Sequence, residues 1–138
     1  MVIVLRKVSN IDWNYVLNLR NKFFKSFYKQ NRPILQEEHY AYMEKQTSNS
    51  KFFQWIICND NKDVGYVRIL DFDVSIMIDD EFQGLGYSSA ALKLVEKEAK
   101  KIGLEKLTAL VKVDNPQSKH LFENNNFTLK SNHYEKKL

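Results

Sequence analysis

The sequence is poor in cysteine, proline and glycine, and it has no long apolar segment. One cysteine, Cys58, among 138 residues excludes an internal disulfide framework and a cysteine-rich zinc site. Cys58 ends the apolar run 52–58, where a free thiol is typically buried and structural. No apolar stretch approaches the roughly 18 residues that cross a membrane, and the start at 1–7 is too short for a secretory signal. We therefore expect a cytoplasmic protein without a membrane partner.

Charge of one sign does not dominate the chain. Lys and Arg number 21 and Asp and Glu number 17, which gives a net charge of +4. Lysines in the stretch 88–102 alternate with glutamates, as on a solvated helix face, so nucleic acid is not an expected partner. The histidines His39, His120 and His133 are far apart and show no metal-ligand spacing, so no metal is expected. This mild positive charge suits a small polyanionic ligand.

The hydropathy period changes along the chain and marks the expected elements. Strands are expected at 2–8, 52–58, 64–70, 72–78, 107–113 and 127–134. Helices are expected from Trp13 with apolar positions reaching Phe27, and at 36–46, 88–102 and 117–124. Asn115-Pro116 provides a capping residue and a first-position proline for the last helix. We predict one α/β domain over residues 1–138, with a mixed, mostly antiparallel sheet.

The segment 76–90 carries the clearest functional signal, because a strand leads into a glycine-bearing loop that opens a long helix. Gly84 and Gly86 carry no Cβ and let a ligand approach the backbone. The first turn of a helix offers unpaired N–H groups and the positive end of the helix dipole, which attract phosphate. The loop lacks the lysine of a P-loop, and Ser89 stands where a dinucleotide fold needs its third glycine. The segment therefore predicts a phosphate-binding loop of another kind.

Two motifs resemble those of the GCN5-related N-acetyltransferases (GNATs). Gln83-x-x-Gly86-x-Ser88 resembles that family's Gln/Arg-x-x-Gly-x-Gly/Ala loop. Downstream, 113–118 followed by 121–123 and 126–127 resembles its second signature, an Asn, a helix with Leu-Tyr-Glu, and then Gly-Phe. The expected element order also matches over essentially the whole chain. The resemblance implies a GNAT fold whose sheet splays at its centre, with flanking helices, and acetyl transfer from acetyl-CoA to a primary amine.

The resemblance also implies where acetyl-CoA, the co-substrate, would lie. Ile76 and Ile78 would pair with the pantetheine arm, Asn115 would bond the arm, and Lys119 and Phe122 would lie along CoA. The pyrophosphate would be held by the loop residues Gln83, Gly84, Leu85, Gly86, Tyr87, Ser88 and Ser89.

This sequence departs from the family pattern at two positions of the second signature. Phe122 stands where many members carry a tyrosine acid, and a phenyl ring cannot protonate the leaving thiolate. Water, or Tyr134 as a weak candidate, is left for that role. Asn126 replaces a glycine, which is a mild change because Asn tolerates positive φ.

The acceptor side resembles a GNAT subgroup that acetylates nucleotide-linked amino sugars. The resemblance lies in Leu19-Arg20-Asn21, in 36–40 and in the strand that contains Arg68. It implies a substrate-binding set of Arg20, Asn21 and Arg68, whose cations suit a diphosphate. The catalytic candidates are His39, Glu38 and Asp73.

Simpler roles stay open for several of these residues. Arg20 and Arg68 can form surface ion pairs, His39 can pack, and Glu38 can serve as a first-turn helix charge. The alternative functions are acetylation of a protein N-terminus or a polyamine, and a non-catalytic acyl-CoA sensor. The family commonly forms homodimers, so a homodimer is one option for assembly.

Overall fold

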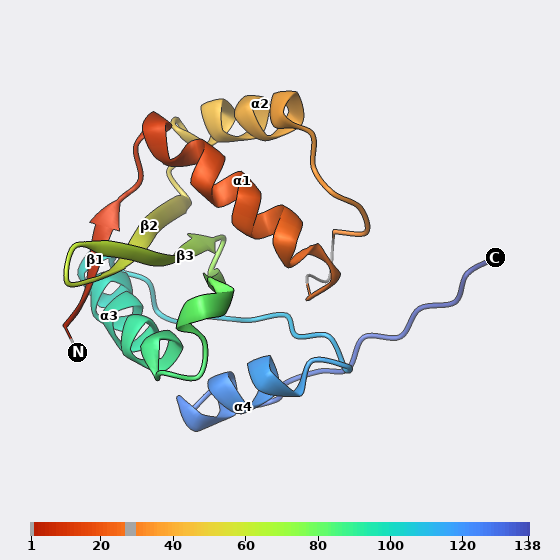
Figure 1. Ribbon diagram of the computed structural model, residues 1–138. Helices are drawn as coiled ribbons and strands as arrows, with labels where there is room; N and C mark the ends of the chain where they lie inside the picture. The colour runs from red at the N-terminus through yellow and green to blue at the C-terminus, as the bar shows by residue number, and fades with distance from the viewer. Residues whose placement is uncertain (1, 27–29) are drawn as a thin grey trace.

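A four-stranded antiparallel sheet forms the centre of the computed structural model, which describes residues 2–26 and 30–138 (Figure 1). The strands follow the order β1-β2-β3-β4, with bounds of Ile3–Lys7, Phe52–Asn59, Lys62–Leu70 and Asp73–Ile78. β4 is therefore an edge strand. This arrangement confirms the predicted fold class and its first four strands.

Both hairpins of the sheet close with two-residue turns. Asp60 and Asn61 join β2 to β3 with φ values of 49° and 68°, and Asp71 and Phe72 join β3 to β4 with 49° and 72°. Two central residues with positive φ match the twist of the flanking strands. The predicted turn at 59–62 is confirmed.

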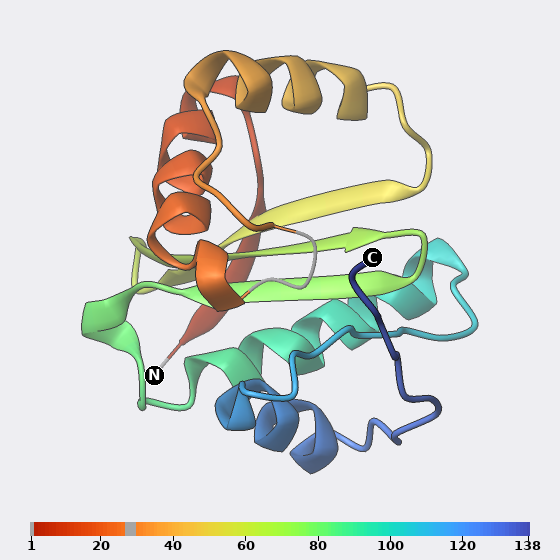
Figure 2. The ribbon, with the colours of Figure 1, turned by 90° about the vertical axis from the view of Figure 1, so that its right-hand side faces the viewer.

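Helices cover both faces of the sheet (Figure 2). α1 (Trp13–Lys22) and α2 (Gln36–Gln46) lie on one face, over a core that includes Val16, Met43 and Tyr66. α3 (Tyr87–Ile102) and α4 (Pro116–Asn124) lie on the other face, over a second core. The buried residues of this second core come from β2, β3, β4, α3 and α4: Trp55, Ile57, Val64, Val67, Ile69, Val74, Ile78, Ala91, Leu92, Val95, Ala99 and Phe122. Single 3₁₀ turns lie at Asn10–Asp12, Phe24–Ser26 and Asp80–Phe82.

Two predicted strands, 107–113 and 127–134, are not formed, so these predictions are wrong. Only Thr108 pairs with the sheet, through one parallel bridge to Asp73. After α4 the chain runs away from the body in Figure 1, and every residue of 128–138 is exposed. A strand forms only where a neighbouring strand pairs with its backbone N–H and C=O groups. An apolar pattern alone does not supply that neighbouring strand.

The first helix is shorter than predicted. It ends at Lys22, and Phe24 starts a separate 3₁₀ turn after Phe23 has left the helical backbone with φ −112° and ψ 16°. The last apolar position of the expected stripe, Phe27, lies outside the described residues. The mixed polar stretch 20–22 precedes this break.

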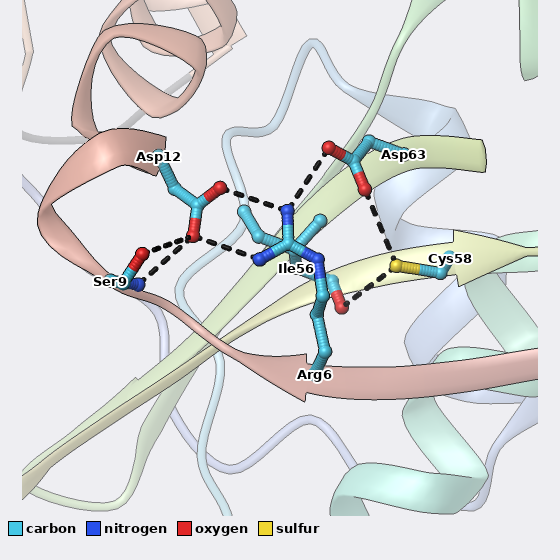
Figure 3. Close-up of polar contacts among 6 residues, drawn as sticks. All are labelled: Arg6, Ser9, Asp12, Ile56, Cys58 and Asp63. Atoms are coloured by element: carbon cyan, nitrogen blue, oxygen red, sulfur yellow. Dashed lines mark hydrogen bonds and ion pairs between the residues drawn. The ribbon is translucent and has the colours of Figure 1, made fainter. Parts of the chain in front are cut away.

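An ion-pair cluster fixes the start of α1 against the sheet (Figure 3). The Arg6 guanidinium donates to both carboxylate oxygens of Asp12, at 2.9 and 2.8 Å, and to Asp63 at 3.1 Å. Ser9 N–H also donates to Asp12, which closes the turn before α1. The Cys58 thiol donates to Asp63 at 3.4 Å and is 4% exposed, and burial raises its pKa. Cys58 is thus buried and structural, as predicted.

Candidate functional site

A cleft of about 1380 Å³ runs along β4 and between the two helical layers. All the predicted site residues line this cleft except Asn21, Leu85 and Lys119. Asn21 instead exchanges two hydrogen bonds with the backbone of Ile34, at 2.9 and 2.7 Å, which fixes the chain before α2. Leu85 is 54% exposed on the loop, and Lys119 is exposed on α4.

The outer edge of β4 is open where the sequence predicted the pantetheine arm. At the start of β4, the Val74 N–H donates to the Thr108 carbonyl at 2.8 Å, so the even-numbered amides of this strand face away from β3. The backbone of Ile76 faces the same way, and no described residue bonds it there. The segment after Thr108 diverges, and Leu110 is 58% exposed. An extended ligand can therefore add to this edge as a further strand.

The loop between β4 and α3 is held by its own polar side chains. Gln83 Nε2 donates to the Ile78 carbonyl at 3.0 Å, and Asp79 caps the 3₁₀ turn by accepting from the Asp80 N–H at 2.8 Å. Gly84 and Gly86 adopt φ values of 77° and 81°. A Cβ added at either glycine would meet no protein atom within 4 Å, so the loop borders open space.

α4 closes the opposite wall of the cleft. Asn115 caps this helix by accepting from the Ser118 N–H at 3.2 Å, and Pro116 takes the first helical position, as predicted. Phe122 is 8% exposed and packs edge-on against Phe127, with 5.0 Å between ring centroids. Asn126 adopts φ 69°, so it takes the glycine-like backbone expected of it.

Arginine and carboxylate side chains meet at the end of the cleft where the sequence predicted the acceptor, here called the acceptor end. Arg68 Nη1 donates to the Asp73 carbonyl at 2.9 Å and to its carboxylate at 3.2 Å. Arg20 from α1 lies near Arg68; burial is the main cause of its lowered pKa, and the charge of Arg68 lowers it further. Two neighbouring guanidiniums at a buried wall favour an anionic ligand.

His39 and Glu38 line the cleft but already have partners. His39 is 2% exposed, and its Nε2 lies 2.9 Å from the Trp13 carbonyl. A carbonyl only accepts, so Nε2 carries the hydrogen, and the bond joins α2 to α1. Burial lowers the pKa of His39. Glu38 pairs with Arg32 at 2.9 Å, which lowers the pKa of its carboxyl. The catalytic assignment of both residues stays a prediction.

Sequence reasoning missed a polar feature of the acceptor end. Gln30 Oε1, Arg68 Nε and Asp73 Oδ1 are buried, have no hydrogen-bond partner among the described residues, and belong to residues that line this one cleft. Buried polar groups are normally paired, so such a cluster indicates the place of a polar ligand. Gln30 comes from the segment between α1 and α2, beyond the last apolar position of the predicted helical stripe, and no sequence signal places it in the cleft.

The chain belongs to the acetyltransferase (GNAT) family, whose profile matches residues 13–127. This confirms the class predicted from the two motifs, an acetyl-CoA-dependent N-acetyltransferase. No curated protein matches the chain significantly.

Several solved structures share the fold. A domain from Methanocaldococcus jannaschii DSM 2661 has a TM-score of 0.85 at 27% identity, covering 97% of this chain and 93% of that one. Spermidine N-acetyltransferase from Vibrio cholerae, in complex with CoA and spermine, has a TM-score of 0.83 at 20% identity, covering 94% and 82%. A transcriptional regulator from Bacillus halodurans C-125 has a TM-score of 0.79 at 13% identity, covering 99% and 100%.

Among the described residues, no His, Cys, Asp and Glu side chains group in threes or more in a way that could hold a metal ion. None of the helices built from these residues has the length and apolar character needed to cross a membrane.

Proposed function

We propose that this acetyltransferase transfers the acetyl group of acetyl-CoA to the amino group of a nucleotide-linked amino sugar. The observation that carries the proposal is the junction of two different surfaces in one cleft. One end has an open strand edge and a glycine loop, and the other has the guanidiniums of Arg20 and Arg68. These surfaces suit a thioester carrier with a pyrophosphate and an anionic acceptor, respectively.

The donor end fits acetyl-CoA on three structural grounds. On the open edge of β4, the Ile76 backbone has no partner in the part of the chain that the structure describes, so it can bond an extended arm. Gly84 and Gly86 adopt positive φ and carry no Cβ, so the loop backbone is exposed beside open space. The first N–H groups of α3, a 16-residue helix, have no partner within the helix and can bond phosphate oxygens. Ile78 differs from Ile76, because its backbone carbonyl already accepts a hydrogen bond from the Gln83 side chain.

The charge of the cleft lining favours an anionic acceptor over a polyamine. Three carboxylates line the cleft, and each faces a basic side chain: Glu38 with Arg32, Asp71 with Lys51, and Asp73 with Arg68, at 2.9, 3.7 and 3.2 Å. A polycation would need carboxylates not already neutralised in this way. Arg20 adds a further positive charge, so a diphosphate is the better match.

The acceptor amine must lose a proton before it attacks, and Asp73 is placed to help. When bound, acetyl-CoA supplies the thioester carbonyl that the amine attacks. Arg68 holds one carboxylate oxygen of Asp73, while Oδ1 is buried with no partner among residues 2–26 and 30–138 and can bond the amine or a water that takes its proton. Tyr134 is 89% exposed and does not line the cleft, so we assign protonation of the thiolate to water.

Two alternatives have specific support. The Vibrio cholerae spermidine N-acetyltransferase shares the fold, which keeps a polyamine acceptor in the comparison. The Bacillus halodurans transcriptional regulator shares the fold too. Phe122 also lacks the hydroxyl of the usual tyrosine acid, so a non-catalytic acyl-CoA sensor is the second alternative.

A thiol-release assay tests the proposal directly. Acetyl-CoA is offered with UDP-linked amino sugars, N-terminal peptides and polyamines. We expect turnover on a nucleotide-linked amino sugar and much weaker release with spermidine. Fast release with spermidine alone would replace the proposed acceptor, and tight acetyl-CoA binding with no release across the panel would favour the sensor.

A further inference from the structure

Asn125, at the end of α4, connects the two helices that border the donor end. Its side chain is buried, with 9% of the residue exposed. Nδ2 donates to the Leu121 carbonyl at 2.8 Å and to Ser89 Oγ at 3.3 Å. Because a carbonyl can only accept, the bond to Leu121 fixes which end of the amide carries hydrogens. The second amide hydrogen therefore faces Ser89.

This bond determines what the Ser89 hydroxyl can do. Ser89 Oγ accepts from Asn125, so its own hydrogen must go to another acceptor. Among the residues that the structure describes, none accepts that hydrogen. Ser89 is the third residue of α3 and lines the cleft, beside the unpaired backbone N–H groups of the first turn. The hydrogen is thus left for a ligand in the cleft.

We propose that Asn125 is a positioning residue that makes Ser89 a hydrogen-bond donor to the pyrophosphate of acetyl-CoA. The inference rests on the proposed binding of acetyl-CoA at this loop. A serine hydroxyl with no donor beside it can rotate and turn a lone pair toward a phosphate oxygen, and the lone pair and the oxygen then repel each other. The amide of Asn125 occupies the lone-pair side, so the hydroxyl offers its hydrogen in the direction of the phosphate.

A double-mutant cycle measures this coupling. CoA binding is measured by calorimetry for the natural chain, Ser89→Ala, Asn125→Ala and the double variant. Pantetheine, which has the arm without the pyrophosphate, is the control ligand. We expect Ser89→Ala to weaken CoA binding about tenfold, as for a lost hydrogen bond to a charged group near solvent. Pantetheine binding should not change.

The coupling itself gives the decisive numbers. In the Asn125→Ala background, Ser89→Ala should weaken CoA binding by less than about twofold, because the donor is no longer positioned. Equal losses in both backgrounds, or equal losses for CoA and pantetheine, would overturn the inference. If Asn125→Ala does not fold, as judged by circular dichroism, Asn125→Asp replaces it, because its carboxylate would accept the Ser89 hydrogen. In the Asn125→Asp background, Ser89→Ala should again weaken CoA binding by less than about twofold, and a tenfold weakening would overturn the inference.

The cycle also separates this inference from the proposed function. If the natural chain does not bind CoA at all, both the pyrophosphate site and the role of Asn125 are wrong. If it binds CoA but the cycle is additive, only the role of Asn125 is wrong.

Discussion

Replacing Gly86 with valine separates backbone strain from loss of the ligand. Gly86 caps the start of α3 with φ 81°, and no protein atom lies within 4 Å of the Cβ that a substitution would add. The added Cβ therefore has room within the protein. Holding an L-residue in the left-handed region costs about 1–2 kcal/mol, which corresponds to a melting temperature lower by about 4–8 °C for a chain of this size.

The valine side chain would occupy the space that the pyrophosphate needs. Losing two charge-assisted bonds between loop N–H groups and phosphate would weaken CoA binding by about 100-fold or more. Calorimetric titration with CoA measures this loss, and a melting curve measures the strain in the same sample.

Gly103→Val is a matched control for Gly86→Val. Gly103 ends the same helix with φ 96°, also has no atom within 4 Å of an added Cβ, and does not line the cleft. We expect the same loss of stability with unchanged CoA affinity. If Gly86→Val binds CoA as tightly as Gly103→Val does, the loop does not hold the pyrophosphate.

Three further changes test other parts of the structure. Arg68→Ala should raise KM for a nucleotide-linked acceptor by about tenfold and leave KM for acetyl-CoA unchanged; equal effects on both would make Arg68 structural. Phe122→Tyr should not lower turnover in the thiol-release assay if Phe122, which packs in the core against Phe127, serves only to line the CoA side of the cleft; a large loss would mean that the site cannot accommodate a hydroxyl. Asp12→Asn should destabilise the fold by about 2–3 kcal/mol at pH 7, because its carboxylate accepts from Arg6 and Ser9 while 8% exposed.

The pH dependence of the Asp12→Asn difference has a defined sign. The hydrogen bond from Arg6 lowers the pKa of Asp12 in the folded chain. The stabilisation is therefore complete above the pKa of the unfolded chain, about 4, and is lost as pH falls through the lower, folded value. Urea unfolding at pH 7 and at acid pH checks this, and a difference that grows on acidification would contradict it.

The sequence predicts the secondary structure around the donor half of the cleft well because its signals are local. A strand, two glycines and a helix start follow one another within 76–90, and Asn115-Pro116 marks the next helix by capping chemistry alone. Turn residues are equally local, and the β2–β3 turn lies at the predicted place. Such features depend on neighbours only a few residues away.

The acceptor half depends on contacts between distant residues, and the sequence predicts it less completely. His39 bonds a carbonyl 26 residues away, which no periodicity reveals. The donor end has one such contact too, because Asn125 bonds Ser89 across 36 residues. The segment 107–113 has the apolar pattern of a strand, yet only Thr108 of this segment pairs with the sheet. In each case the role is set by what lies alongside in space.

The alternation of β4 explains how the two halves meet. Side chains of successive residues point to opposite faces of a strand, so Asp73 and Met77 share the face covered by α1 and α2, whereas Val74 and Ile78 face α3 and α4. Arg68 pairs with Asp73 on the first of these faces. The open backbone edge at Ile76 lies about 10 Å further along the same strand. Under the proposed function, β4 would therefore present the Asp73 carboxylate to the acceptor amine and its open backbone edge to the donor, with both groups fixed on one strand.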